Sequence, residues 1–221
     1  MRAIFDQELE QVGDDLLQMS KHVADAISNA SQALVTGDLE LAERVIEADA
    51  KVDELERALD ERCITLLARQ QPVATDLRII VSSLRMSSSI ERMGDLARHI
   101  AQVVRLRYPE AALPEGAKRV FNELAEAAIK VAGDIVELLS THDLQLASAV
   151  ERDDDVLDQL HTETFKITLA DSWQGSVAQT VDVTLLARFF ERCGDHAVSV
   201  ARRITYLVTG DLDAGNGNAD G

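Results

Sequence analysis

Apolar residues recur along this chain at the spacing of amphipathic α-helices. From residue 9 onward they occupy positions i, i+3, i+4 and i+7, and this period continues almost without a break. The first apolar stripe runs through Leu9, Val12, Leu16, Met19, Val23 and Ile27. Because each stripe must be covered by stripes on other helices, the pattern predicts an all-α fold.

Short stretches rich in turn-forming residues divide this pattern into six segments. They are TGD at 36–38, the stretch around Pro72, RYPEAALPEG at 107–116, THD at 141–143 and WQGS at 173–176. We therefore predict six long helices, and connections this short make neighbouring helices antiparallel. The central stretch, which contains Pro109 and Pro114, divides the helices three and three.

The two sets of three helices are an internal repeat. TGDLELAERV at 36–45 aligns with THDLQLASAV at 141–150 at an offset of 105, and ERMGD at 91–95 aligns with ERCGD at 191–195 at an offset of 100. A deletion in the second half accounts for the change of offset. The sequence thus predicts two tandem, pseudo-symmetric three-helix bundles. Their predicted bounds are 1–108 and 115–209, with a linker at 109–114 and a disordered tail at 210–221.

Each half carries two pairs of acidic residues spaced four apart, one pair on its second helix and one on its third. This spacing places both members of a pair on one helix face. With 39 acids in 221 residues, random placement gives roughly 7 such pairs, so no single pair is informative. The eight residues are Asp49, Asp53, Glu91 and Asp95 in the first half, and Asp154, Asp158, Glu191 and Asp195 in the second.

The positions of these pairs relative to the turns make them more informative. In two antiparallel helices, residues equidistant from the intervening turn lie at the same height. The first-half pairs have midpoints at 51 and 93, which average to 72, the position of the proline in the turn. The second-half midpoints, 156 and 193, average to 174.5, inside WQGS. We therefore expect the two acidic pairs of each half to face each other.

Four carboxylates at one height repel one another unless cations lie among them. Oxygen ligands suit hard cations such as magnesium, manganese or iron, and suit zinc less well. Ion pairing is an alternative, because Arg98 follows Asp95 by three residues and Arg188 precedes Glu191 by three. From the residues alone, metal binding, structural ion pairing and catalysis all stay open.

Several neighbours of the acidic pairs are weaker candidates. His99, His161 and Glu56 could serve as accessory metal ligands, although surface or capping roles also suit them. Gly94 and Gly194 lie inside predicted helices, where glycine costs up to about 1 kcal/mol relative to alanine. Such glycines allow close approach of backbone, of metal or simply of another helix.

Composition narrows the classes of function. The net charge of −17 argues against binding to a nucleic-acid backbone. No apolar run approaches the roughly 20 residues that a membrane span requires, and the first residues lack the apolar core of a signal peptide. Cys63 and Cys193 have no disulfide or zinc spacing, so we interpret them as reduced core residues of a cytoplasmic protein. No nucleotide-binding loop or catalytic triad pattern occurs, which favours a protein without enzymatic activity.

Taken in order, these motifs resemble the PhoU family, the phosphate-uptake regulatory proteins of bacteria. The resemblance extends from residue 1 to about residue 208, and its composition is similar to that of actinobacterial, in particular mycobacterial, members. QQPVATDLR at 70–78 resembles the family's turn between its second and third helices. ERMGDLARHIA and ERCGDHAVSVA resemble its signature segments, and DAKVDEL and DDVLDQL resemble its acidic ones.

The resemblance implies a specific function. Family members are cytoplasmic, often dimeric and not enzymes, and they repress the phosphate-starvation response. They link the phosphate-specific ABC transporter, with its ATPase, to a sensor histidine kinase. They hold iron or other metal clusters on acidic motifs, which map onto the eight acids named above. Family signatures often continue to an asparagine where this chain has His99 and Ser199, so the geometry of a cluster here can differ.

Two rival functions follow from the same residues. A ferritin-like di-iron oxidase needs Glu-x-x-His motifs from two helices. Only Asp158-x-x-His161 approximates this motif, and the first half has Asp53-x-x-Glu56. The second rival is a metal-free helical scaffold. It predicts that replacing the signature acids with amides leaves function intact and raises thermal stability.

Overall fold

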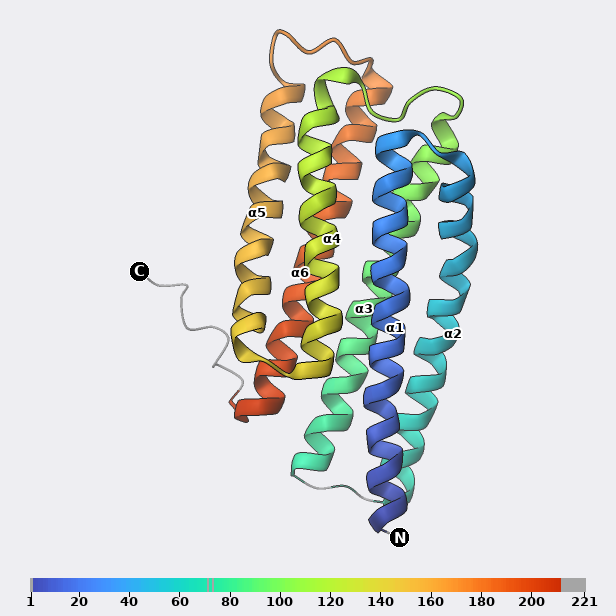
Figure 1. The fold of residues 1–221 in the computed structure, drawn as a ribbon, viewed down its shortest axis with the longest axis vertical. Helices are drawn as coiled ribbons and strands as arrows, with labels where there is room; N and C mark the ends of the chain where they lie inside the picture. Colours follow the sequence, from blue (N-terminus) through green and yellow to red (C-terminus); the bar gives the residue numbers. More distant parts are fainter. Residues whose placement is uncertain (1, 71, 73, 212–221) are drawn as a thin grey trace.

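A computed structural model describes residues 2–70, 72 and 74–211 (Figure 1). These residues form six α-helices and one short 3₁₀ helix, and no strand occurs among them. The helices are α1 (Arg2–Thr36), α2 (Leu39–Gln70), α3 (Thr75–Arg107), η1 (Glu115–Ala117), α4 (Lys118–Thr141), α5 (Leu144–Thr168) and α6 (Val177–Thr209). The predicted all-α fold of two pseudo-symmetric three-helix bundles is confirmed.

The helices end where the turn residues predicted. Gly37 takes a left-handed backbone conformation (φ 73°) between α1 and α2, and His142 does the same (φ 55°) between α4 and α5. Ser176 caps α6 by accepting a hydrogen bond from the backbone N–H of Gln179, while the Gln179 side chain accepts one from the Ser176 N–H. These caps satisfy backbone groups that the helix leaves unpaired, and so fix where each helix begins and ends.

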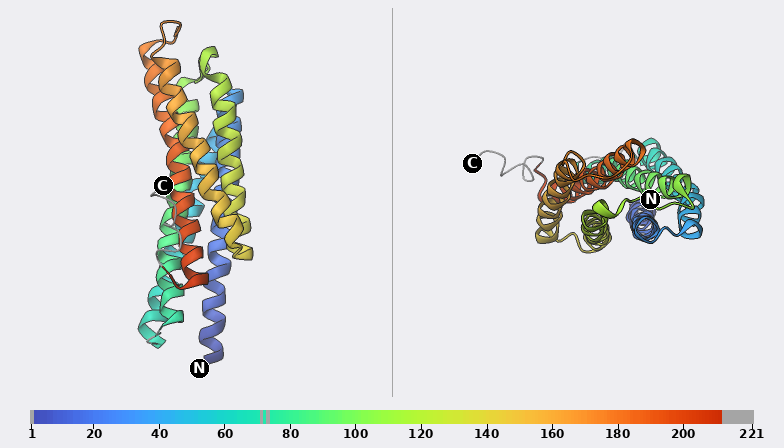
Figure 2. Two further views of the ribbon diagram at one scale, coloured as in Figure 1. Left: turned by 90° about the vertical axis from the view of Figure 1, so that its left-hand side faces the viewer. Right: turned by 90° about the horizontal axis from the view of Figure 1, so that it is seen from above.

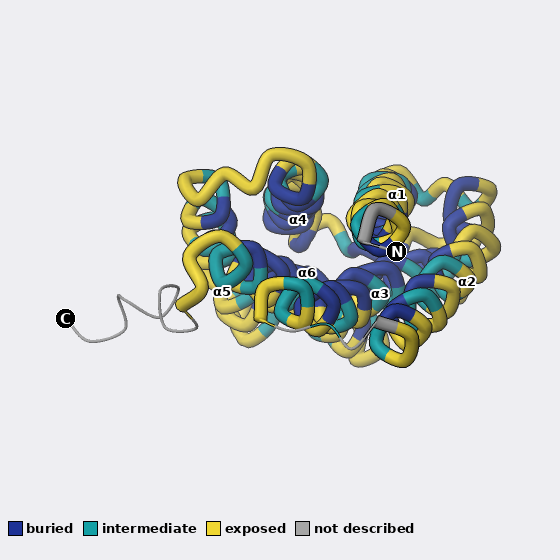
Figure 3. The backbone as a smooth tube through the Cα atoms, turned by 90° about the horizontal axis from the view of Figure 1, so that it is seen from below, coloured by how far each residue is buried: buried dark blue, intermediate teal, exposed yellow. Residues whose placement is uncertain are grey.

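The six helices pack in two layers. Seen along the helices, α2, α3, α6 and α5 lie side by side in that order, and α1 and α4 cover one face of this row (Figures 2 and 3). The two halves meet where α3 contacts α6 and where α1 contacts α4. Buried positions face the space between the layers (Figure 3). Each three-helix unit therefore covers its apolar stripes partly with the other unit.

The core is aliphatic, with few aromatic rings. Among its fully buried side chains are Met19, Ile27, Met86, Ile90, Phe121 and Phe190. Cys63 and Cys193 are free and buried, as the sequence indicated. Burial raises the pKa of each thiol to about 12, so neither is a thiolate near neutral pH.

The segment between α3 and α4 is more than a surface linker. Ala112 and Leu113 are buried to 4% exposure and belong to the core. The sequence pattern did not predict this, because a short alanine–leucine pair between two prolines has no period. At the other end of the second half, α6 ends at Thr209 and Gly210 caps it in a left-handed conformation. The predicted disordered tail lies outside the described residues from 212 onward.

Candidate functional site

The first acidic cluster lies between α2 and α3. It comprises Asp49, Asp53, Glu56, Glu91 and Asp95, which lie close enough to influence one another's ionisation. The register predicted from the turns thus brings together carboxylates from two helices. Most of these side chains are partly buried: those of Glu91 and Asp95 are each 15% exposed.

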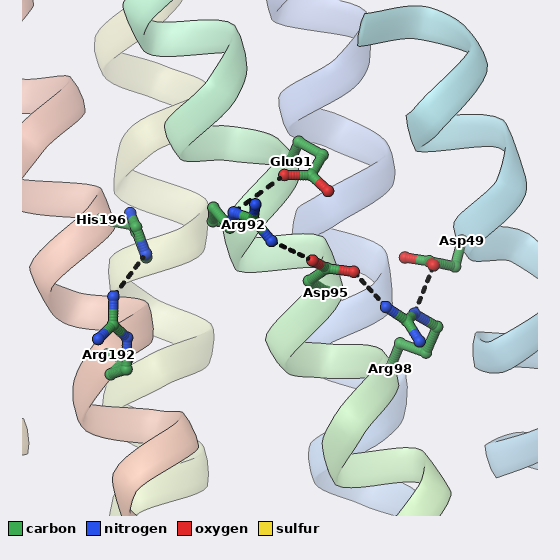
Figure 4. A network of polar contacts seen from close by, with 7 residues as sticks. All are labelled: Asp49, Glu91, Arg92, Asp95, Arg98, Arg192 and His196. Carbon is green, nitrogen blue, oxygen red and sulfur yellow. Dashed lines mark hydrogen bonds and ion pairs between the residues drawn. The ribbon is translucent and has the colours of Figure 1, made fainter.

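Two arginine side chains pair with three acids of the first cluster, Asp49, Glu91 and Asp95 (Figure 4). The Nε of Arg98 lies 2.5 Å from Asp49 Oδ2 on the neighbouring helix, and its Nη2 also pairs with Asp95. Arg92 lies 2.8 Å from Asp95 and 3.6 Å from Glu91. Arg98 thus bridges α2 and α3 and provides the positive charge that facing carboxylates need.

The carboxyls of the first cluster differ in the direction in which their pKa values shift. Burial opposes ionisation of Asp95, but the hydrogen bond from Arg98 and the charges of Arg98 and Arg92 outweigh it and lower the pKa. Burial, followed by the nearby charge of Asp95, raises the pKa of Glu91 to about 7. Burial also raises the pKa of Asp49, although Arg98 opposes the shift.

The second acidic cluster lies between α5 and α6. It comprises Asp154, Asp158, Glu191 and Asp195, whose charges again act on one another. Its ion pair is local, from Arg188 to Glu191 within α6. The position equivalent to Arg98 is Val198, so no arginine bridges these two helices at that place.

The second cluster therefore holds buried oxygen atoms without partners. Asp154 Oδ1 and Glu191 Oε2 are both inaccessible to solvent and accept no hydrogen bond. Burial, followed by the charges of Asp158 and Asp195, raises the pKa of Asp154 to about 7. Asp158 and Asp195 themselves are exposed, which leaves the cluster open to solvent on one side. Buried acceptors of this kind normally have a partner, so this cluster has unused capacity for a cation.

The two signature glycines differ in what surrounds them. A Cβ added to Gly194 would overlap Asp154 Oδ1 and lie 2.8 Å from Leu157 Cδ1. A Cβ at Gly94 would meet only ordinary contacts, the nearest being Val23 Cγ2 at 3.4 Å. Gly194 therefore allows the Asp154 carboxyl to lie directly against α6, and Gly94 has no such role.

The histidines lie at the edges of the clusters. His99 packs against Phe189 of α6, with ring centroids 5.4 Å apart, and His161 packs against Phe165 at 5.0 Å. Burial, followed by the charge of Arg188, lowers the pKa of His161 despite the opposing effect of Asp158. His196 is half-buried, and its Nε2 lies 3.5 Å from the guanidinium of Arg192, one turn earlier on α6 (Figure 4).

The two acidic clusters differ in how well their residues fit a metal ion. As the side chains stand, no three His, Cys, Asp or Glu residues within the described part of the chain converge closely enough to hold one. The second cluster nevertheless has the right chemistry, because two of its buried carboxylate oxygens lack partners and Val198 stands where Arg98 bridges the first cluster. The first cluster fits only if Arg98 moves away, because that side chain takes oxygens of both Asp49 and Asp95.

The sequence matches one protein-family model twice, once in each half. The model described as the PhoU domain matches residues 16–104 and 121–204, one stretch in each half. The chain belongs to the PhoU family. Each matched stretch lies within one of the three-helix units, so the repeat is the repeat of this domain.

Curated relatives in the PhoU family match nearly the whole chain. The phosphate-specific transport system accessory protein PhoU homolog 2 of Mycobacterium tuberculosis is 40% identical over 95% of this chain and 99% of its own length. PhoU homolog 1 of Mycobacterium leprae is 39% identical over 96% of each chain. The crystal structure of PhoU from Pseudomonas aeruginosa is 30% identical, with a TM-score of 0.86 over 94% of this chain and all of that one.

Proposed function

We propose that this protein is a negative regulator of phosphate uptake and of the phosphate-starvation response. In this proposal it is an adaptor without enzymatic activity at the cytoplasmic face of the membrane. It contacts the ATPase of a phosphate-specific ABC transporter and a sensor histidine kinase, and reports the state of one to the other. It acts as a homodimer and binds no nucleic acid.

One observation carries this proposal. Both three-helix units match the PhoU domain, and full-length relatives at 36–40% identity are named as accessory proteins of the phosphate-specific transport system. A structural relative from Streptococcus pneumoniae, 27% identical with a TM-score of 0.82, is named a phosphate transport system regulatory protein. Long helices with large exposed faces suit a protein whose output is binding. None of the described helices is long and apolar enough to cross a membrane.

Complementation tests the regulatory role. The host is a mycobacterium whose own PhoU-family genes are deleted, and the readouts are phosphate uptake and transcription of the transporter genes in phosphate-rich medium. We expect this protein to restore repression of both. Unchanged uptake and transcription, with the protein present at normal abundance, would contradict the proposal.

We further propose that the second acidic cluster binds a metal ion, with iron, manganese, magnesium and zinc as the candidates. Asp154 and Glu191 supply buried oxygen ligands, and Asp158 and Asp195 supply carboxylate oxygens on the side that is open to solvent. A bound cation would neutralise the repulsion among four carboxylates and so join α5 to α6, as Arg98 joins α2 to α3.

Thermal unfolding after chelation tests this metal proposal. A ligand that binds only the folded state stabilises it by about 2.7 kcal/mol at 100 times its dissociation constant. We expect manganese or ferrous iron to raise the melting temperature of the wild type, and to have no such effect on Asp154→Asn/Glu191→Gln. The matched control, Asp49→Asn/Glu91→Gln in the first cluster, should retain the shift.

A further inference from the structure

A groove of about 800 Å³ runs between the two halves at the end of the molecule where α1 begins. The first half of α1 forms one wall. The start of α3, the end of α6 and the turn between α4 and α5 form the rest. All of these elements lie at the same end of the molecule as the N-terminus (Figure 1).

The interior of this groove is apolar. Leu16, Met86 and Ile204 are buried beneath it, and Leu17 and Leu207 are partly exposed along its walls. Gly13 leaves the groove open along α1, because a Cβ added there would meet nothing within 4 Å. Partly exposed leucines on both walls are the lining that an apolar partner needs.

The repeat shows that these apolar walls are not required by the fold. Leu17, Ile79 and Leu207 align with Asn122, Gln179 and Arg107, which occupy the pseudo-symmetric place at the other end of the molecule. There, Arg107 donates hydrogen bonds of 2.5 and 3.0 Å to the two carboxylate oxygens of Asp182. The same architecture therefore stands with polar walls at one end and apolar walls at the other.

The rim of the groove is acidic. Asp6, Glu10 and Asp14 of α1 lie along it, and the described residues that line it include no lysine or arginine. Glu10 and Asp14 are exposed and make no ion pair. A second copy of this chain, with its net charge of −17, is a poor occupant. The last ten residues, LDAGNGNADG, contain two aspartates and no basic residue, so they suit the groove no better.

We propose that this groove binds an amphipathic helix of a partner protein, with the apolar face of that helix between α1 and α6 and its lysines or arginines against Glu10 and Asp14. The wall from residue 6 to residue 17 is about 16 Å long at 1.5 Å per residue, enough for three turns of helix. Apolar anchors at i, i+3, i+4 and i+7 are the mode of recognition that such a groove allows. The proposal depends neither on phosphate regulation nor on metal.

Fluorescence anisotropy with a labelled peptide tests the proposal. The probe is an 18-residue helix of leucines on one face and lysines on the other, titrated with the full-length wild-type protein. Gly13→Leu fills the groove, and we expect it to weaken binding at least tenfold. Gly133→Leu is the matched control, because Gly133 of α4 is also a helical glycine with nothing within 4 Å of an added Cβ. It should bind as the wild type does.

A charge pair separates groove binding from general attraction to an acidic protein. Glu10→Gln/Asp14→Gln should weaken binding severalfold and reduce its salt dependence. Glu43→Gln/Glu47→Gln, with the same i, i+4 spacing on the exposed face of α2, should not. The groove is excluded if the peptide fails to bind the wild type. It is also excluded if Gly13→Leu and Gly133→Leu bind alike, or if the two charge variants do, with circular dichroism showing all variants folded.

Discussion

Arg98 lies between Asp49 of α2 and Asp95 of α3, and Val198 takes its place in the second half. One side chain therefore decides how each acidic cluster balances its charge. In the first cluster the cation between the two helices is part of the chain. In the second, Arg188 pairs with Glu191 within α6, and a cation between the helices at this place must come from solution or stay absent. The clusters are alike in their acids and differ in the residue between them.

This role of Arg98 predicts a loss of stability when it is removed. Arg98→Ala leaves the partly buried Asp49 carboxylate without its partner and leaves Asp95 paired with Arg92 alone, which costs about 1–3 kcal/mol. Urea unfolding in the presence of a chelator measures the free energy of unfolding. Arg57→Ala serves as the control, because the Arg57 side chain is exposed and bonds only to a backbone carbonyl. Equal, small changes in both variants would show that Arg98 is not a bridge.

The carboxyl of Asp154 predicts an unusual pH dependence. Its pKa rises from 3.8 to about 7 on folding, so the metal-free folded protein binds this proton more tightly than the unfolded chain. The stability that this proton provides is present at low pH and is lost as pH rises from about 4 through 7.

Metal-free Asp154→Asn should therefore gain stability relative to the wild type as the pH is raised from 5 to 8. Urea unfolding at each pH in chelator measures the difference. Asp171→Asn, at an exposed position outside the second cluster, is the control and should follow the wild type. A difference that stays constant with pH would contradict this account of Asp154.

At the scale of the helix pair, the two signature glycines predict opposite outcomes. Gly94→Ala places a methyl group in ordinary contact and should stabilise α3 by up to about 1 kcal/mol through helix propensity. Gly194→Ala forces the Asp154 carboxyl and Leu157 to move, and should lower the free energy of unfolding instead. Chemical unfolding of the two variants side by side checks the signs. Equal effects would mean that α5 does not approach α6 as closely as described.

Sequence alone predicts much at this scale. Turn residues mark where the helices end. Gly37 takes a left-handed conformation that few other residues adopt, and the Ser176 side chain accepts a hydrogen bond from a backbone N–H at the start of α6. The midpoint of each acid pair depends only on the helical rise and the turn, so the meeting of the acids follows from arithmetic. The partners of Arg98 do not follow, because a long side chain can reach along its own helix or across to another. Its spacing from Asp95 predicted the first contact and missed Asp49.

At the scale of the whole molecule, the contacts that join the two halves cannot be predicted from the helical period of the sequence. Arg107 of α3 and Asp182 of α6 form an ion pair across the halves, with the Asp182 side chain 6% exposed. These two residues are 75 positions apart in the sequence, so their pairing depends on how one three-helix unit packs on the other. The apolar groove has the same origin, because its walls come from four separate elements.

This inter-half ion pair gives a prediction about stability. Arg107→Leu alone leaves the buried Asp182 carboxylate unpaired, and we expect it to lower the free energy of unfolding. Arg107→Leu/Asp182→Ser introduces here the residue types of the aligned positions in the other half, Leu207 and Ser82. This double variant should recover most of that loss. The two unfolding free energies are compared with the wild type. A double variant as unstable as the single one would show that the loss does not come from the unpaired Asp182 carboxylate.

The most direct test of this account is the metal content of each half. Wild type, the first-cluster variant Asp49→Asn/Glu91→Gln and the second-cluster variant Asp154→Asn/Glu191→Gln are purified without chelator or metal-affinity resin and analysed for elements. We predict iron, manganese, magnesium or zinc in the wild type and the first-cluster variant, and its loss in the second-cluster variant. Equal metal in all three proteins, or none in the wild type, would contradict the claim that Arg98 serves one cluster and a metal ion the other.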